Sequence, residues 1–130
     1  MQSPTVNQQI TFIYTDNLNK SAEFYENIIG LSLWRDQGTC RIYSLTESAL
    51  LGVCAVGPKS KGKFIPGDQQ NIIITLVTDE VDKWYSHLQS KGISFEKPPA
   101  INPNYNIYHC FLRDPSGYLI EIQHFLDDTD

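Results

Sequence analysis

The chain has 130 residues, of which 41% are hydrophobic and 19% charged, and this is the size and composition of one packed globular domain. Its net charge of −5 argues against a nucleic-acid partner, because a phosphate backbone is bound by clustered Lys and Arg. No apolar run is long enough to cross a bilayer, so we expect no membrane partner.

The first half of the chain predicts a strand, a helix and three further strands. The β-branched and aromatic run at 10–15 indicates a strand, and the Thr-Asp-Asn cluster at its end suits a helix N-terminus. Four apolar residues then fall on one helical face: Leu18, Ala22, Tyr25 and Ile29. Gly30 suits a left-handed C-terminal cap. After it the hydrophobic period changes to two, which predicts strands over 31–37, 39–45 and 49–56.

The second half of the chain repeats this pattern. The repeated residues are Thr15, Asp16, Lys20 and Gly30, which recur as Thr78, Asp79, Lys83 and Gly92. A strand is predicted over 72–78, and the apolar face of the helix after it consists of Val81, Trp84, Tyr85 and Leu88. Three more strands are predicted over 93–97, 107–113 and 118–125. We therefore predict an α+β fold made of two βαβββ modules.

The two modules imply a cleft. We predict a single domain over 1–130, with the first module at about 8–57, a polar linker at 58–70 and the second module at about 71–125. Each helix covers only one face of a four-stranded sheet, so the other face must meet its counterpart or enclose something. We therefore expect the modules to form a curved sheet around a shared cleft.

The turn Asp-Pro-Ser-Gly at 114–117 sets the register of the last hairpin. Pro115 suits the first central position of a type I turn, and Gly117 suits the left-handed residue that follows. The cross-strand pairs that result are Phe111 with Glu121, Arg113 with Leu119, and His109 with Gln123. This face is mixed in polarity and would line the cleft, whereas the opposite face is apolar and would lie under the helix.

Glu121 is the most informative residue of this face, because it is a carboxylate within an apolar strand. Its burial without a partner would be costly. Two interpretations stay open: a cross-strand ion pair with Arg113, or a ligand-binding or catalytic role. His109 faces the same way, and its simplest interpretation is a half-exposed side chain that bonds to Gln123 or water. Glu121 and His109 are the candidate catalytic residues.

The cysteines, Cys40, Cys54 and Cys110, are odd in number and lie within predicted strands. None forms a CxxC pair, which argues against a zinc finger or a redox motif. We therefore expect three reduced, buried thiols in a cytoplasmic protein. The first residues lack the charged and apolar pattern of a secretory leader, which agrees with this expectation.

Two motifs resemble a known family. "DNLNKSAEFYENIIGL" at 16–31 and "DPSGYLIEI" at 114–122, within two βαβββ modules, resemble the vicinal oxygen chelate superfamily. That group contains glyoxalase I, bleomycin-resistance proteins, fosfomycin-resistance enzymes and extradiol dioxygenases. The resemblance extends over about 8–125 and implies a glyoxalase-like fold. It also implies a homodimer, in which modules are sometimes exchanged between chains.

The resemblance also implies a metal, but the residues depart from the pattern. Enzymes of the family hold a divalent metal with one residue from the first strand of each module and a glutamate from the last strand. Glu121 falls on the glutamate position, whereas Ile10 and Ile73 fall on the other two and cannot bind a metal. The nearest amides, which are weak ligands, are Gln8, Gln9 and Asn71. Phe111 takes the place of the reactive tyrosine of the dioxygenases. We expect no cofactor, with a metal held by Glu121, His109 and one such amide as the alternative.

Two functions remain open, beside a third alternative in which the chain is a regulatory or interaction domain whose cleft is vestigial. In the first, the domain binds a small, partly aromatic molecule in the inter-module cleft without the usual metal triad, as in the bleomycin-resistance branch. The candidate ligand-binding residues are Ile10, Phe12, Tyr14, Trp34, Ile73, Thr75, Phe111, Arg113 and Leu119. In the second, the domain is a metal-dependent lyase, isomerase or dioxygenase of the glyoxalase type, with Glu121 as metal ligand or general base.

Overall fold

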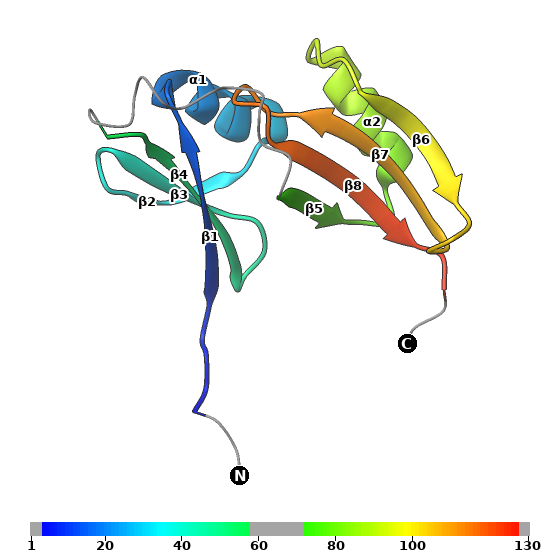
Figure 1. The fold of residues 1–130 in the computed structure, drawn as a ribbon, viewed down its shortest axis with the longest axis horizontal. Helices are drawn as coiled ribbons and strands as arrows, with labels where there is room; N and C mark the ends of the chain where they lie inside the picture. The colour runs from blue at the N-terminus through cyan, green and yellow to red at the C-terminus, as the bar shows by residue number, and fades with distance from the viewer. Residues whose placement is uncertain (1–3, 58–71, 128–130) are drawn as a thin grey trace. The chain divides into compact units, whose positions relative to one another are not determined.

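The structure, a computed structural model, describes residues 4–57 and 72–127. The chain divides into two compact units, Met1–Pro66 and Gly67–Asp130. Each has a helical segment and one four-stranded sheet (Figure 1). The linker predicted over 58–70 lies outside the described residues. Within the described ranges, no helix is long and apolar enough to span a membrane.

The first unit follows the predicted order of elements. Its elements are β1 (Gln9–Thr15), α1 (Leu18–Glu23), the π-helical turn η1 (Phe24–Ile29), β2 (Ser32–Asp36), β3 (Cys40–Ser44) and β4 (Ala49–Ala55). The strand order is β1-β4-β3-β2, with β1 parallel to β4 and the other neighbours antiparallel. Ala22, Tyr25 and Ile29 of the predicted helical face are buried, and α1 packs against β4.

The second unit repeats this topology. Its elements are β5 (Ile73–Val77), α2 (Val81–Ser90), β6 (Lys97–Asn102), β7 (Ile107–Arg113) and β8 (Leu119–Phe125). The strand order is β5-β8-β7-β6, with β5 parallel to β8 and the other neighbours antiparallel. The two units therefore confirm the α+β fold of two βαβββ modules.

The ends of both helical segments follow the predicted signals in part. The side chain of Asn17 accepts a hydrogen bond from the Lys20 backbone N–H at 3.1 Å, which caps α1. Gly30 and Gly92 have φ values of 87° and 88°, as the predicted left-handed positions require. At α2 the N-cap residue Glu80 makes no capping hydrogen bond with its side chain, and its own N–H donates to the Thr78 hydroxyl at 3.0 Å.

The strand predicted over 93–97 is wrong, because β6 begins only at Lys97 and includes Pro98 and Pro99. Proline cannot donate to a sheet ladder and is confined to edge strands and bulges. β6 is the edge strand of its sheet, and its register with β7 shifts between Lys97 and Ala100. The two prolines therefore occupy an irregular part of an edge strand, where the missing N–H groups cost little.

The predicted register of the last hairpin is confirmed. Phe111 pairs with Glu121, Arg113 with Leu119, and His109 with Gln123. Gly117 has a φ of 94°, and its N–H donates to the Asp114 carbonyl at 3.0 Å, which closes the turn. Four residues of the alternate face are at most 1% exposed: Cys110, Leu112, Ile120 and Ile122. α2 packs against β6, β7 and β8 and covers this face.

The expectation of three reduced thiols is wrong for two of the cysteines. Cys40 and Cys54 form a disulfide, and Cys110 is the free, buried cysteine of the described residues. The reason is the register of the β3–β4 hairpin, which places Cys40 directly opposite Cys54 with their Cα atoms 4.0 Å apart. The inference of a cytoplasmic location rested on reduced thiols, so this bond removes that support.

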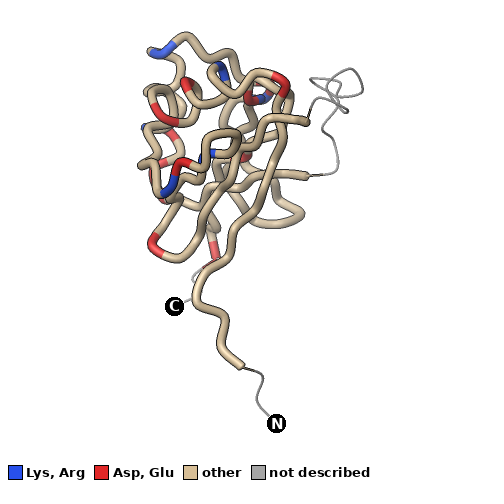
Figure 2. The backbone as a smooth tube through the Cα atoms, turned by 90° about the vertical axis from the view of Figure 1, so that its left-hand side faces the viewer, with Lys and Arg blue, Asp and Glu red and all other residues tan. Residues whose placement is uncertain are grey.

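The parallel pair of β1 and β4, which carries no charged residue (Figure 2), contains a close contact between a ring and a glycine. Phe12 lies beside Gly52 in the register, and a Cβ added to Gly52 would lie 2.3 Å from Phe12 Cδ1. We therefore expect Gly52→Ala to displace the ring and to lower the free energy of unfolding by about 1–3 kcal/mol in urea titrations.

A double-mutant cycle checks the cause of this loss. In a Phe12→Ala background the ring is absent, so Gly52→Ala should leave the free energy of unfolding almost unchanged. Gly57→Ala is the matched control, because no atom of the described residues lies within 4 Å of the position of its added Cβ. Equal costs of Gly52→Ala with and without Phe12 would contradict the assignment of the contact.

Candidate functional site

A hollow of about 370 Å³ lies on the face of the second sheet opposite α2. It is lined by Ile73, Asn102, Tyr105, Ile107, His109, Phe111, Glu121, Gln123 and Phe125. Its walls are thus mainly apolar and aromatic, with polar groups gathered around one carboxylate. The alternation of side chains along β7 and β8 explains the composition, since every second residue of each strand faces this side.

Glu121 is held by side chains from both neighbouring strands and from its own strand β8, and its exposed fraction is 8%. The hydroxyl of Thr75, its register partner on β5, donates to Oε1 at 2.9 Å. Nδ1 of His109, on β7, lies 2.6 Å from Oε2. The Gln123 amide, oriented with its nitrogen toward the carboxylate, donates to Oε2 at 2.9 Å. We call these four residues the Glu121 cluster. Its three donors satisfy the buried carboxylate, as burial requires.

The alternative in which Arg113 pairs with Glu121 is wrong. Arg113 Nε donates to Glu96 Oε2 at 2.6 Å, and Nη1 donates to the Gly117 carbonyl at 3.0 Å. Arg113 lies at the end of β7, where the backbone N–H of Glu96 already bonds to the Phe111 carbonyl and brings that carboxylate close. The hydrogen bond from Arg113 lowers the pKa of Glu96. Arg113 therefore stabilises the turn end of the hairpin.

The simplest interpretation of His109 is also wrong. Its side chain is 15% exposed, and Nδ1 bonds to Glu121 rather than to Gln123. The diagonal position of His109 relative to Glu121 on adjacent strands allows this contact. The imidazole also stacks edge-to-face on Phe111, with the ring centroids 4.9 Å apart. His109 is thus fixed in the wall of the hollow by both a polar and an aromatic neighbour.

The other residues predicted for the site separate into two groups. In the second unit, Ile73 and Phe111 line the hollow and Thr75 belongs to the Glu121 cluster, whereas Arg113 and Leu119 are not among the lining residues. The candidates from the first unit lie on its own sheet: Ile10, Phe12 and Tyr14 on β1 and Trp34 on β2. Phe12 and Tyr14 are 42% and 50% exposed, on the side of β1 opposite the buried Ile13.

The sequence placed Gln123 on this face but did not single out four other lining residues: Asn102, Tyr105, Ile107 and Phe125. The alternation that placed His109 and Glu121 on this face also places Ile107 and Phe125 there, so a signal existed for these two. Asn102 and Tyr105 come from the end of β6 and the connection after it. No hydrophobic periodicity marks these two residues, because Pro98 and Pro99 interrupt the alternating pattern of β6.

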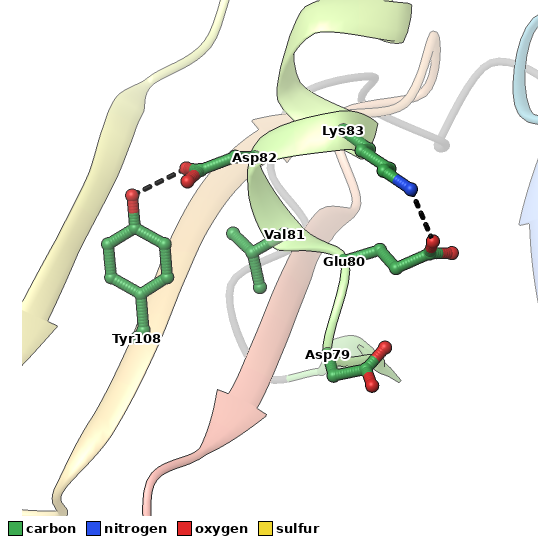
Figure 3. Close-up of a pocket in the computed structure, with 6 residues that line it drawn as sticks. All are labelled: Asp79, Glu80, Val81, Asp82, Lys83 and Tyr108. Carbon is green, nitrogen blue, oxygen red and sulfur yellow. Dashed lines mark hydrogen bonds and ion pairs between the residues drawn. The ribbon is translucent and has the colours of Figure 1, made fainter.

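A second hollow lies at the start of α2 (Figure 3) and is lined by Asp79, Glu80, Val81, Asp82, Lys83 and Tyr108. Lys83 Nζ lies 3.1 Å from Glu80 Oε1, and the hydroxyl of Tyr108 donates to Asp82. That hydrogen bond raises the pKa of Tyr108. Four of the six lining residues carry a formal charge, so this hollow lacks the mainly apolar and aromatic walls of the one around Glu121.

The two modules and the carboxylate on the last strand define a class, that of the two-module α+β proteins with a pocket on a sheet face. A family model described as Glyoxalase/Bleomycin resistance protein/Dioxygenase superfamily matches residues 7–122, and the chain belongs to this superfamily. It is 29% identical over 129 residues to YraH, an uncharacterised protein of Bacillus subtilis, with 91% of this chain and 97% of that one covered.

Two solved structures are similar in fold. One is a glyoxalase/bleomycin resistance protein/dioxygenase from Nocardioides, with a TM-score of 0.79, 19% identity, and 100% of this chain and 89% of that one covered. The other is a lactoylglutathione lyase from Agrobacterium tumefaciens, with a TM-score of 0.70, 22% identity, and coverage of 94% and 95%. Together they establish the glyoxalase-like fold that the sequence motifs predicted.

Proposed function

We propose that the chain binds a small, partly aromatic molecule in the hollow on the second sheet. The observation that carries this proposal is the combination of apolar and aromatic walls with one small group of fixed polar atoms, which is typical of small-molecule sites. Phe111, Phe125 and Ile73 supply surface for a flat ligand, and the Glu121 cluster supplies orientation.

We also propose that binding does not require the metal of the superfamily. The expected ligand positions on β1 and β5 carry the hydrocarbon side chains of Ile10 and Ile73. The oxygens of Glu121 already accept hydrogen bonds from Thr75, His109 and Gln123. The described residues contain no group of three or more His, Cys, Asp or Glu suited to a metal, and Asn71, one of the possible amide ligands, lies outside them. The side chains at the expected ligand positions therefore fit a metal poorly.

A thermal-shift screen tests both proposals. Flat neutral aromatic molecules, each with and without EDTA, should raise the melting temperature equally, and a concentration of about 100 Kd adds about 2.7 kcal/mol to the free energy of unfolding. Phe111→Ala should remove the effect, while Val77→Ala, on the same sheet but outside the hollow, should retain it. A shift that requires the metal, or nickel, zinc or iron near one per purified chain, would contradict metal-independent binding. A shift that Phe111→Ala leaves unchanged would contradict the location.

A further inference from the structure

The contact between His109 and Glu121 determines which nitrogen of the imidazole carries the proton. Nδ1 lies 2.6 Å from Glu121 Oε2, and an ionised carboxylate only accepts hydrogen bonds. Nδ1 must therefore donate. In the neutral imidazole, the proton on Nδ1 leaves Nε2 as an acceptor. Thr75 and Gln123 hold the Glu121 carboxylate in place, and the carboxylate in turn fixes the orientation of the His109 ring.

Nε2 of His109 is available to a ligand. Among residues 4–57 and 72–127, none forms a hydrogen bond with this atom, although the imidazole lines the hollow and is only 15% exposed. A ligand that enters the hollow covers the remaining surface of the ring and removes Nε2 from water. Because a buried acceptor without a partner is costly, the ligand that binds best is one that supplies a donor.

The charges around the hollow limit the donor to a neutral group. Glu121 is the one formally charged residue among those that line the hollow within the described part of the chain, and no Lys or Arg accompanies it. A carboxylate or phosphate ligand would meet this negative charge without a counter-ion. A cationic ligand finds the oxygens of Glu121 already taken by three donors. A neutral hydroxyl meets neither obstacle.

We propose that His109 accepts a hydrogen bond at Nε2 from a hydroxyl group of an aromatic or enolic ligand, so that the hollow selects a phenol over its methyl ether. Glu121 acts as a positioning residue that holds the imidazole in the required tautomer. Phe111, edge-to-face on the imidazole, provides the surface on which the aromatic ring lies. This inference rests on the proposed function and names the chemical class of its ligand.

The first test needs no ligand. Nitrogen-15 chemical shifts of the labelled full-length chain at neutral pH distinguish the two neutral tautomers and the imidazolium. His109 should carry its proton on Nδ1, and in Glu121→Gln, whose amide both donates and accepts, the two tautomers should become mixed. His87→Gln and His124→Gln assign the signals of the other two histidines. A proton on Nε2 of the native protein, in either the neutral or the charged ring, would overturn the proposal.

The second test compares phenol with anisole, in which a methyl group replaces the donating proton. Titration calorimetry at neutral pH, where phenol keeps its proton, should show the phenol binding about tenfold more tightly, which is the effect of one hydrogen bond. His109→Phe retains an aromatic ring but no acceptor, so this preference should disappear. His124→Gln, on the opposite face of β8, should retain it.

The outcomes distinguish the role of His109 as an acceptor from the proposed binding of a small molecule in the hollow. If both molecules bind equally, and Phe111→Ala weakens both, the binding site stands and the role of His109 is overturned. If the phenol preference survives in His109→Phe, the acceptor is another group and the proposal is again overturned. If neither molecule binds, the proposed function fails for aromatic ligands and the inference fails with it. Tighter binding of benzylammonium than of the phenol would overturn the choice of a neutral ligand.

Discussion

Reduction of the Cys40–Cys54 disulfide should lower the free energy of unfolding of the first unit by about 3 kcal/mol. The bond joins residues separated by 14 positions, and cross-linking a loop of about that length restricts the unfolded chain by that amount in the chain-entropy model. The folded unit should keep its topology, because Cys40 and Cys54 are already paired in the backbone register of β3 and β4. The effect is therefore on stability rather than on fold.

The measurement is a urea titration with and without a reducing agent, followed by tryptophan fluorescence. The chain has two tryptophans, Trp34 in the first unit and Trp84 in the second. Trp84→Phe leaves Trp34 as the reporter of the unit that contains the disulfide. The double variant Cys40→Ala, Cys54→Ala should unfold at the lower urea concentration whether or not the reducing agent is present. An equal response to the reducing agent in this variant would contradict the assignment.

Thiol counting gives an independent check of the same bond. Burial raises the pKa of the Cys110 thiol to about 11, so it is protonated and unreactive at pH 8 in the folded protein. The native chain should therefore bind no maleimide, and the urea-unfolded chain should bind one per molecule until it is reduced. Three reactive thiols in the unfolded, unreduced chain would show that Cys40 and Cys54 are not joined.

The features that the sequence predicted are those with local signals. Pro115 and Gly117 determine the turn of the last hairpin, and the turn determines the register, so the pairing of Phe111 with Glu121 followed from four residues. The helix ends depend in the same way on Asn17, Gly30 and Gly92. The repetition of these signals in both halves was enough to predict two modules of one topology.

The features that the sequence did not predict depend on side chains that meet across strands. Arg113 reaches Glu96 because β6 lies beside β7 at that point, and the prolines had hidden the position of β6. Glu121 instead bonds to His109, which lies diagonally across from it on β7. The list of directly opposite cross-strand pairs does not show this diagonal contact. The disulfide was within reach of prediction, because the β3–β4 hairpin aligns Cys40 with Cys54, but a count of cysteines does not use that register.

Leu112 and Phe111, neighbours on β7 that face opposite sides of the sheet, should separate stability from binding. Leu112 has no exposed surface and lies on the face that α2 covers, so Leu112→Ala should cost about 2–5 kcal/mol, through lost burial and the cavity left behind. Phe111 borders the hollow and has few neighbours on that side. Phe111→Ala should therefore lower the free energy of unfolding by less than Leu112→Ala does. Both costs are measured by urea unfolding in a Trp34→Phe background, where Trp84 on α2 reports on the second unit.

Ligand affinity should show the reverse order. At temperatures where both variants are folded, Leu112→Ala should bind phenol nearly as well as the unmodified chain, because the hollow is on the other side of the sheet. Phe111→Ala should bind it at least tenfold more weakly, since the ring supplies the aromatic surface beside His109. If Phe111→Ala lost as much stability as Leu112→Ala and kept its affinity, Phe111 would be a core residue, and the hollow could not be the binding site.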